Sequence, residues 1–311
     1  MLTFKTEGYN GYSVQFSPFV EHKLACASSA NFGLVGNGRL FILNLGTTPN
    51  GMSMERMFDT QDGLFDCSWS EINENQIVTA SGDGSIKLWD ITLAEFPIRN
   101  WKEHQREVFS VHWNYIKKDT FVSGSWDQTI KLWHPDQPQS LSTFTGHTAC
   151  IYSTLWSPYN ADLFGSVSGD RTFRLWDTKT PKPVIVIPAH RDEILSFDWN
   201  KYRDQTIVTG SVDTTLRIWD LRFPDREVKT LQGHQYAVRR VKYSPHSGDI
   251  IASASYDMTM RVWNVATMNP LLMLHNLHTE FVLGIDFNLY VEGQIATCAW
   301  DEMVHVIQLV S

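Results

Sequence analysis

A unit of about 44 residues recurs through most of the chain and constrains its fold more than any other feature. Each copy has an aspartate followed by a short segment of alternating polar and apolar residues, which in most copies ends in tryptophan, as in Asp127 to Trp133. The repeated aspartates lie 43 or 44 residues apart: Asp83, Asp127, Asp170, Asp213, Asp257 and Asp301. A fixed period of this length indicates that one supersecondary unit is repeated and that neighbouring units bury each other's apolar faces.

Two further residue types keep a constant distance from the aspartate. A histidine precedes it by 23 residues in five copies, at His104, His147, His190, His234 and His278. An aromatic residue precedes it by 14 residues in all six copies, at Trp69, Trp113, Trp156, Trp199, Tyr243 and Phe287. Turn residues recur every eight to twelve positions between these markers, which indicates short antiparallel strands. The pattern is typical of WD repeats and predicts an all-β propeller with four strands in each blade.

The two ends of the chain predict a further blade and the missing strand of the last one. Residues 36–43 align with the Asp83 segment, with Asn37 in place of the aspartate, and predict a degenerate first blade. The last repeat has Ile307 in place of tryptophan and lacks a fourth strand, which Leu2 to Thr6 can supply. We therefore expect a seven-bladed WD-repeat β-propeller closed by the N-terminal strand, with no long sheet edge exposed. No linker or low-complexity segment interrupts the pattern, so residues 1–311 are expected to form one domain.

The recurring polar residues resemble a catalytic triad but are interpreted as structural. A serine or threonine stands four residues before each repeated aspartate, and in a WD blade it joins the histidine, aspartate and tryptophan in one hydrogen-bonded network. A catalytic triad occurs once, beside an oxyanion hole, whereas this set recurs in nearly every blade. We expect no catalytic residues and no enzymatic activity. The expected network residues are His104, Ser123, Asp127, Trp133, His147, Ser166, Asp170, Trp176, His190, Thr209, Asp213, Trp219, His234, Ser253, Asp257 and Trp263.

Charge and composition exclude several other classes of function. The net charge of −8 argues against a general affinity for nucleic acid, which requires a basic surface. The segment from Arg239 to Lys242 is an isolated basic stretch, interpreted as a solvated or partner-contacting patch. The longest apolar runs are too short to span a bilayer, and no signal peptide is apparent, so a cytoplasmic protein without membrane insertion is expected. Neither the scattered cysteines nor the remaining histidines have metal-ligand spacing, so we expect no metal and no cofactor.

Candidate binding residues lie where the loop before each inner strand meets the turn between the second and third strands. We call this side of the propeller the upper face. Acidic candidates fall on the second, third and fifth blades, and aromatic candidates surround them. The set is Asp62, Phe65, Asp66, Glu107, Phe109, Trp126, Tyr152, Glu193, Tyr256, Phe281 and Trp300. Such a face suits an amphipathic segment with a basic end. The alternatives are that the aromatic residues pack against neighbouring blades and that the acids are merely solvated.

The chain also resembles a particular family from end to end, the peroxin-7 receptors for the type 2 peroxisomal targeting signal. The segments that carry the resemblance are residues 11–18, 31–38, 62–66, 124–129, 151–158, 187–190 and 278–281. Residues 11–18 matter most, because they belong to the degenerate first blade, where a generic repeat pattern is weakest. The missing tryptophan of the last blade and the missing histidine before Asp83 are imperfections of the repeat, not losses of a family feature.

The resemblance implies a cytosolic import receptor that cycles to the peroxisome. The family binds an N-terminal signal of nine residues: Arg or Lys, an aliphatic residue, five variable residues, His or Gln, then Leu or Ala. The implied partners are cargo proteins with this signal, a co-receptor of the peroxin-20 type or a long form of peroxin-5, and the peroxisomal docking complex. The rival hypothesis is a different WD-repeat scaffold for peptides, such as a ubiquitin-ligase substrate adaptor.

The implied signal agrees with the residues of the upper face. In a helix the first and eighth residues of the signal lie within about 20° of each other, so its basic and His/Gln positions share one side. We hypothesise that Asp62, Glu107 and Asp66 receive the basic residue. The apolar side of the signal would contact Phe109, Trp126, Tyr152 and Trp300.

Overall fold

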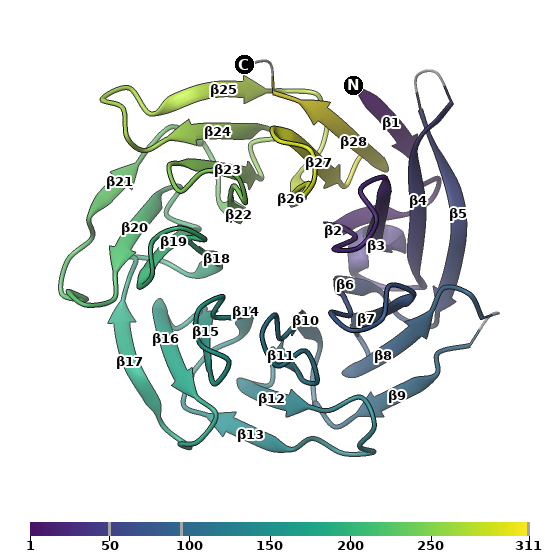
Figure 1. Cartoon of the computed structure of the whole chain (residues 1–311), viewed down its shortest axis with the longest axis horizontal. Helices are drawn as coiled ribbons and strands as arrows, with labels where there is room; N and C mark the ends of the chain where they lie inside the picture. Colours follow the sequence, from purple (N-terminus) through teal and green to yellow (C-terminus); the bar gives the residue numbers. More distant parts are fainter. Residues whose placement is uncertain (49–50, 94–95, 310–311) are drawn as a thin grey trace.

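The computed structural model describes residues 1–48, 51–93 and 96–309, and it shows seven four-stranded blades around a central axis (Figure 1). The fold class predicted from the repeats is therefore confirmed. Five blades are separate sheets, whereas the first and last blades belong to one eight-stranded sheet, which the N-terminal strand joins by pairing with both. Within a blade the strands pair antiparallel from the axis outward, and they follow chain order except for the N-terminal strand of the last blade. Blade 1 differs in its second turn, which contains the short 3-10 helix η1 (Ala30–Gly33).

The strand bounds follow the repeat closely. Blades 1 to 3 consist of β2 (Asn10–Phe16), β3 (Lys23–Ser29), β4 (Gly38–Thr48), β5 (Gly51–Thr60), β6 (Leu64–Trp69), β7 (Gln76–Ser81), β8 (Ser85–Asp90), β9 (Arg99–Lys102), β10 (Val108–Trp113), β11 (Phe121–Ser125), β12 (Thr129–Trp133) and β13 (Ser142–Thr145). Blades 4 and 5 consist of β14 (Ile151–Trp156), β15 (Leu163–Ser168), β16 (Thr172–Asp177), β17 (Pro183–Pro188), β18 (Ile194–Trp199), β19 (Thr206–Ser211), β20 (Leu216–Asp220) and β21 (Lys229–Leu231). Blades 6 and 7 consist of β22 (Val238–Tyr243), β23 (Ile250–Ser255), β24 (Met260–Asn264), β25 (Leu271–His275), β26 (Val282–Phe287), β27 (Gln294–Ala299), β28 (Met303–Gln308) and β1 (Leu2–Lys5).

The two ends of the chain close the ring, as the sequence predicted. Strand β1 pairs antiparallel with β28, from Leu2 opposite Val306 to Lys5 opposite Met303. It therefore forms the outer strand of the last blade, and Figure 1 shows β1 alongside β28 there. The Phe4 ring lies 6.1 Å from the Phe41 ring of blade 1, so β1 also joins the first blade to the last. None of the helices in the described part of the chain is long and apolar enough to cross a bilayer.

The core consists of apolar side chains pressed between neighbouring blades. On β12, Ile130, Leu132 and Trp133 are buried, while Lys131 between them is partly exposed, as expected for a strand with alternating faces. The ring of Trp133 stacks at 6.2 Å on Phe121, which in turn lies 5.4 Å from Trp113 of the inner strand. These buried rings of blade 3 belong to one apolar cluster with Val78 and Ile86 of blade 2, so they pack the two neighbouring blades against each other.

A hydrogen-bonded network fixes the geometry of most blades. In blade 3, His104 Nδ1 lies 2.8 Å from Asp127 Oδ2, and His104 Nε2 lies 2.7 Å from Ser123 Oγ. Trp133 Nε1 donates to the same Ser123 Oγ at 2.8 Å. The equivalent bonds recur in blades 4, 5 and 6, around His147, His190 and His234. Each buried polar group of the set thus has a partner, which is the structural arrangement that repetition in the sequence implies.

Candidate functional site

The inner strand of every blade contains a β-bulge near its start. The pairing register shifts by one residue there, for example between Leu64 and Asp66 on β6 and between Val108 and Ser110 on β10. A bulge leaves one residue unpaired and redirects its side chain. The seven bulge residues are Tyr12, Phe65, Phe109, Tyr152, Leu195, Arg239 and Leu283. All seven line one cavity of about 480 Å³ at the upper end of the central channel.

Residues of the loops above these bulges form the wall of this upper cavity. They include the turn residues Trp126, Val212, Tyr256 and Trp300, the two acids Glu107 and Glu193, and residues 32–34 beside η1. A cavity of this size with predominantly apolar walls and a few charged groups has the character of a ligand site.

The aromatic side chains of the cavity stack on one another as well as facing the open space. The Phe109 ring lies 4.4 Å from the Phe65 ring and 4.6 Å from the Trp126 ring, and both pairs are nearly parallel. On the other side, Phe281 stacks between Tyr256 at 4.8 Å and Trp300 at 5.2 Å. Most of these rings therefore both pack on a neighbouring ring and line the open cavity.

The two acids of the cavity have different surroundings. Glu193 accepts a hydrogen bond from the Tyr152 hydroxyl at 2.7 Å, and the pKa of Tyr152 is raised by burial and by this carboxylate. Glu107 Oε2 lies 3.6 Å from Arg106 Nε, and the side chains of both residues are substantially exposed. The Glu107 carboxylate is thus the freer of the two to meet a basic group from outside.

Eight of the eleven candidate residues line the cavity, and three do not. The residues brought together are Phe65, Glu107, Phe109, Trp126, Tyr152, Glu193, Tyr256 and Trp300. Phe281 lies behind the wall, between the two rings on which it stacks. Asp62 is not part of the lining, and it is held in its own loop, where its Oδ1 accepts the backbone N–H of Gly63 at 2.8 Å.

The expectation that Asp66 lies on the upper face is wrong. The residue is 5% exposed and lies below the bulge, inside the channel. Its carboxylate pairs with Arg240 Nη2 at 3.2 Å and accepts the backbone N–H of Val111 at 3.2 Å. The bulge at Phe65 is the cause, because the extra residue lets two successive side chains point toward the axis. Phe65 lines the upper cavity, and Asp66 lies deeper in the channel. With its charge already compensated, Asp66 is not placed to receive a basic residue from a ligand.

The interpretation of Arg239, Arg240 and Lys242 as a solvated patch is also wrong, whereas contact of this segment with a partner stays a prediction. All three lie on the inner strand β22 and line the central channel. Arg239 and Arg240 are buried, and Lys242 faces Asp286 Oδ1 of blade 7 at 3.5 Å. Arg239 stands at the same distance from its blade histidine as Phe109 does, so the repeat alignment contained the signal for its position.

The loop that follows β3 was not among the candidates, although it forms one side of the cavity. Phe32 has a left-handed φ of 57°, and its backbone is fixed at both ends: its N–H donates to Asn10 Oδ1 at 2.7 Å and its carbonyl accepts the Tyr12 hydroxyl at 2.6 Å. Gly33 follows with φ of 71°, and a Cβ atom there would clash with Tyr12. These bonds hold Phe32 5.4 Å from Trp300 and leave Leu34 87% exposed at the rim.

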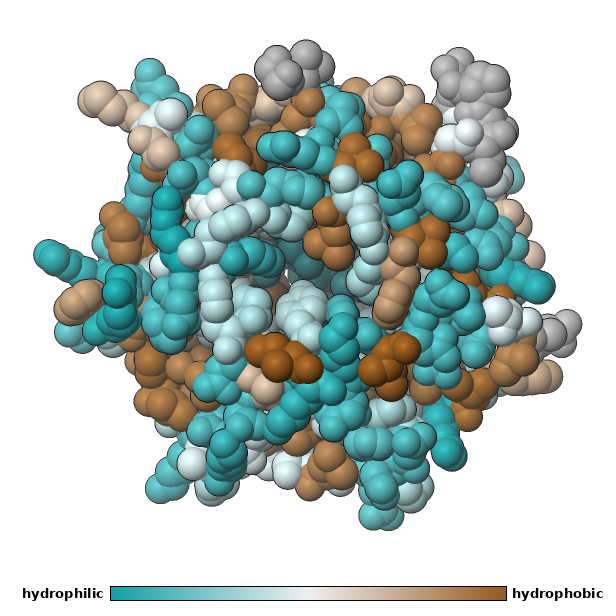
Figure 2. All heavy atoms as spheres, in the orientation of Figure 1, coloured by the Kyte–Doolittle hydropathy of each residue, from teal (hydrophilic) through white to brown (hydrophobic). Residues whose placement is uncertain are grey.

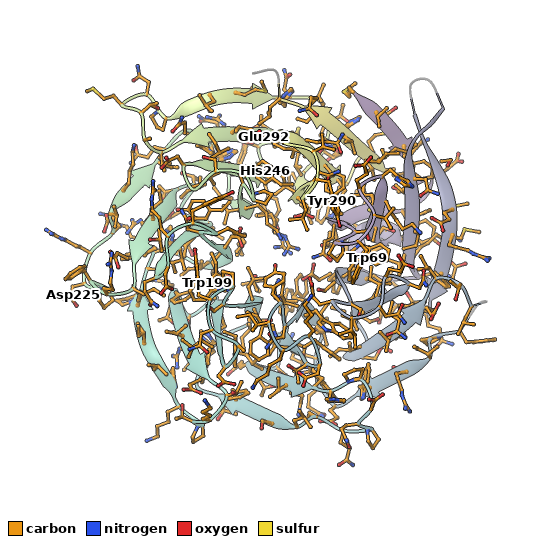
Figure 3. All side chains as sticks on the ribbon, in the orientation of Figure 1. Trp69, Trp199, Asp225, His246, Tyr290 and Glu292 are labelled. Atoms are coloured by element: carbon orange, nitrogen blue, oxygen red, sulfur yellow. The ribbon has the colours of Figure 1, made fainter. Side chains whose placement is uncertain are left out.

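The lower end of the channel opens on the opposite face, which is turned toward the viewer in Figures 1 to 3. Figure 2 shows that the middle of this face is hollowed and surrounded by mostly hydrophilic side chains. A cavity of about 80 Å³ lies there, lined by residues that include Trp69 (labelled in Figure 3), Tyr115, Lys201 and Lys242. The lysines are paired with Asp198 and Asp286. Among the described residues, no group of three or more His, Cys, Asp or Glu side chains could hold a metal ion.

Comparison with known proteins gives consistent matches. The family model for the WD domain, G-beta repeat, matches residues 56–90, 95–134, 138–177, 181–220 and 225–264. The Peroxisomal targeting signal 2 receptor of Dictyostelium discoideum is 53% identical over 289 residues, which cover 92% of this chain and 91% of that protein. The protein of the same name from Mus musculus is 48% identical over 98% of this chain and 95% of its own length. Peroxisome biogenesis protein 7 of Arabidopsis thaliana is 53% identical over 99% of this chain and 98% of its own length.

Proposed function

Because the chain belongs to the family of peroxisomal targeting signal 2 receptors, we propose that it is a cytosolic receptor that binds the type 2 signal of cargo proteins on its upper face. With a co-receptor of the peroxin-20 type or a long peroxin-5, it delivers these proteins to the peroxisomal docking complex for import into the matrix. In this proposal the protein has no catalytic step, and the receptor returns to the cytosol after release.

The observation that carries the proposal is the composition of the upper cavity. Stacked aromatic rings cover much of its wall, and the carboxylates of Glu107 and Glu193 are its two negative charges. An amphipathic helix that begins with Arg or Lys matches both features: its aliphatic side chains contact the rings, and its basic group meets the acids. Since Asp66 is paired inside the channel and Asp62 lies outside the cavity, we now assign the basic residue to Glu107, with Glu193 beside it.

A co-receptor is needed for a physical reason. A helix of nine residues is marginal in water, so the signal loses conformational entropy when it is ordered on the propeller. The helix also has an outer side that the cavity does not cover. A second protein that contacts this outer side would stabilise the ordered helix, so binding by the propeller alone is expected to be weak and binding in the ternary complex tight.

The test is a binding titration with the purified full-length protein. A fluorescently labelled type 2 signal peptide is titrated with the receptor, with and without a candidate co-receptor, and binding is measured by fluorescence anisotropy. The matched control is the same peptide with its first basic residue replaced by glutamate. We expect binding that depends on the basic residue and that tightens when the co-receptor is present.

Absence of binding under both conditions would overturn the proposal. The chain would then be treated as a WD-repeat scaffold for a different peptide, such as a ubiquitin-ligase substrate adaptor, and its partner would be sought without reference to the peroxisome. Binding that is equal for the native and the glutamate peptide would contradict the role assigned to the acids of the upper cavity.

A further inference from the structure

The ring of bulge residues at the base of the upper cavity contains one charge. Six of its members are aromatic or aliphatic, and the seventh is Arg239 of blade 6. Its side chain is 2% exposed, although it forms part of the cavity lining. The guanidinium extends far enough from β22 to lie 6.0 Å from the Phe109 ring of blade 3. A cation is thus held at the floor of the cavity, within a ring of apolar side chains.

This guanidinium has donors without acceptors. Within the part of the chain that the structure describes, neither Nη1 nor Nη2 of Arg239 has a hydrogen-bond partner. The nearby carboxylate of Asp66 is engaged by Arg240 and by the Val111 amide, and that of Glu193 accepts from Tyr152. Burial and the neighbouring Arg240 lower the pKa of Arg239, but an arginine remains protonated in proteins.

A buried cation with unsatisfied donors is destabilising unless an acceptor reaches it. The cavity above Arg239 has room for one, since its volume of about 480 Å³ holds several side chains. Trp126 Nε1 and Trp300 Nε1, on the cavity wall, also lack an acceptor among the described residues. Apart from these donors and the two acids, the lining is mainly aromatic and aliphatic, so the ligand that complements Arg239 combines an apolar stem with oxygen acceptors at its end.

The planar guanidinium selects among such ligands. It matches a carboxylate through two parallel hydrogen bonds, which a single hydroxyl or amide oxygen does not reproduce. Glu107 and Glu193 lie in the same cavity and repel any anion, but the repulsion of a doubly charged phosphate is about twice that of a singly charged carboxylate, so the carboxylate is favoured. The side chains that carry one carboxylate on a short apolar stem are aspartate and glutamate.

We propose that the floor of the upper cavity, formed by Arg239, is a binding site for a carboxylate supplied by an aspartate or glutamate side chain of the segment bound on the upper face. This inference rests on the proposed function, in that the segment is either the targeting signal or the co-receptor. It assigns opposite charges to two depths of one site: the acids Glu107 and Glu193 for the basic residue, and Arg239 for an acidic one.

The first experiment tests the chemistry without any peptide. Sodium hexanoate and 1-hexanol, which share a six-carbon skeleton and differ in the head group, are titrated onto the full-length protein by ligand-observed NMR. We expect hexanoate to bind about tenfold more tightly than hexanol, a ratio that corresponds to about 1.4 kcal/mol. The preference should disappear in Arg239→Met and persist in Arg222→Met, a control at an exposed arginine on the β20–β21 loop.

The second experiment identifies the source of the carboxylate. Signal peptides with glutamate or glutamine at each of the five variable positions are titrated onto wild type and Arg239→Met, with and without co-receptor. A roughly tenfold preference for glutamate at one position, lost in Arg239→Met, assigns the acid to the signal. A loss of affinity in Arg239→Met that appears only with co-receptor present, and is equal for both peptides of each pair, assigns it to the co-receptor.

The outcomes separate this inference from the proposed function. If no peptide binds, the proposed function fails, and the hexanoate titration still decides whether the site takes a carboxylate. If the wild type shows no preference for hexanoate, or if Arg239→Met retains the preference, the inference is overturned. Should Arg239→Met prove unstable in thermal melting, the comparison of the two small ligands on the wild type remains decisive.

Discussion

Glu107 and Glu193 lie in the same cavity but differ in how firmly their carboxylates are held. Glu193 is anchored by the Tyr152 hydroxyl at 2.7 Å, whereas Glu107 has only a 3.6 Å approach from the exposed Arg106. A ligand cation therefore displaces little when it meets Glu107. Single residues decide this difference, because each acid occupies the same place in its own blade and only the neighbouring side chains differ.

Charge reversal at Glu107 should weaken binding of the targeting signal. A partly exposed ion pair contributes up to about 1 kcal/mol, and reversal adds repulsion, so Glu107→Lys is expected to lower affinity at least fivefold. Anisotropy titrations with the signal peptide measure the effect. The matched control is Glu74→Lys, which makes the same change at an exposed residue of the β6–β7 loop on the lower face. Equal affinity for wild type and Glu107→Lys would show that this acid does not receive the basic residue.

Loss of one stacked ring should weaken binding of the targeting signal more than charge reversal at Glu107 does. Trp126 presents one face to Phe109, and truncation to alanine removes both the ring that faces the ligand and the support for its neighbour. For a central aromatic anchor the expected loss is about 2 kcal/mol, or roughly thirtyfold in affinity. Phe223→Ala, at an exposed ring on the outer rim, provides the control. If Trp126→Ala and Phe223→Ala bind the signal alike, the stacked wall is not the contact surface.

At the scale of the blade, the polar network is complete in blades 3 to 6 and partial in two others. In blade 2 the position of the histidine is occupied by another residue, and Thr79 Oγ1 accepts only the indole of Trp89, at 2.9 Å. In blade 7 the histidine is present, with His278 Nε2 2.9 Å from Thr297 Oγ1, but Ile307 replaces the tryptophan. These two blades are natural comparisons for what the full network contributes.

The complete and partial networks should respond differently to the same substitution. Thr209 Oγ1 serves both His190 Nε2 at 2.7 Å and Trp219 Nε1 at 3.0 Å, whereas Thr79 serves one indole. Each buried group left without a partner costs about 1–3 kcal/mol. Thr209→Val should therefore reduce the free energy of unfolding about twice as much as Thr79→Val, as measured by urea denaturation. Equal losses would mean that the histidine bond adds nothing to the stability of the blade.

At the scale of the whole molecule, contacts between the last and first blades determine whether the ring stays closed. Strand β1 pairs with β28, and on the lower face Tyr290, labelled in Figure 3, donates its hydroxyl hydrogen to the Pro18 carbonyl at 2.6 Å. Both contacts join residues that are more than 250 positions apart in the sequence. Because β1 lies between β28 and β5 in the eight-stranded sheet, the outer edge of the last blade is covered and the first and last blades are joined.

Weakening the closure should destabilise the whole ring. Phe4 on β1 packs against Phe41, while its neighbour Lys5 is exposed. Because Phe4 is half-buried, Phe4→Ser is expected to reduce stability by about 1–2 kcal/mol. Lys5→Ser on the same strand should have little effect. Thermal melting checks both variants, and an unchanged melting temperature for Phe4→Ser would show that this side chain does not contribute to closure.

Acidification should also destabilise the propeller. Burial lowers the pKa of His147, His190 and His234 despite their hydrogen bonds to aspartate. The unfolded chain therefore takes up protons from about pH 6.5 downward, while the folded state does not, and each histidine lowers stability by up to about 1.4 kcal/mol per pH unit. Urea midpoints measured between pH 7.5 and 5 should fall steadily. A midpoint that is constant or rises over this range would contradict neutral histidines in the folded network.

Below about pH 4 a second loss is expected. Burial alone would raise the pKa of Asp170, but the hydrogen bonds from His147 and Thr172 outweigh it and hold the pKa well below its ordinary range. A carboxyl group whose pKa is depressed in the folded state stabilises that state above its unfolded pKa, and this contribution disappears as the pH falls toward the folded value. The two processes have the same sign, so the histidines and Asp170 both lower the free energy of unfolding as the pH falls.

The sequence by itself determined the architecture, because each blade is encoded by local signals that recur. Alternation sets which side of a strand is buried, and the fixed offsets place the histidine, serine or threonine, aspartate and tryptophan of one blade within a single span of 30 residues, as from His104 to Trp133. The missing fourth strand predicted closure by β1, since an unpaired edge must find a partner. The same offsets also identified most of the upper-face candidates, including Glu107, Trp126 and Trp300.

Only the tertiary structure decided which of the candidates line the upper cavity and which are paired inside the channel. Asp66 and Arg240 are 174 positions apart, and their ion pair forms only because the ring brings blades 2 and 6 to the same axis. The bulge shifts the pairing register by one residue and so interrupts the alternation of side chains. Phe65 and Arg239 therefore reach the upper cavity, while the residues that follow them, Asp66 and Arg240, point deeper into the channel. A periodic pattern records neighbours along the strand, whereas charge compensation across the axis depends on distances that closure of the ring creates.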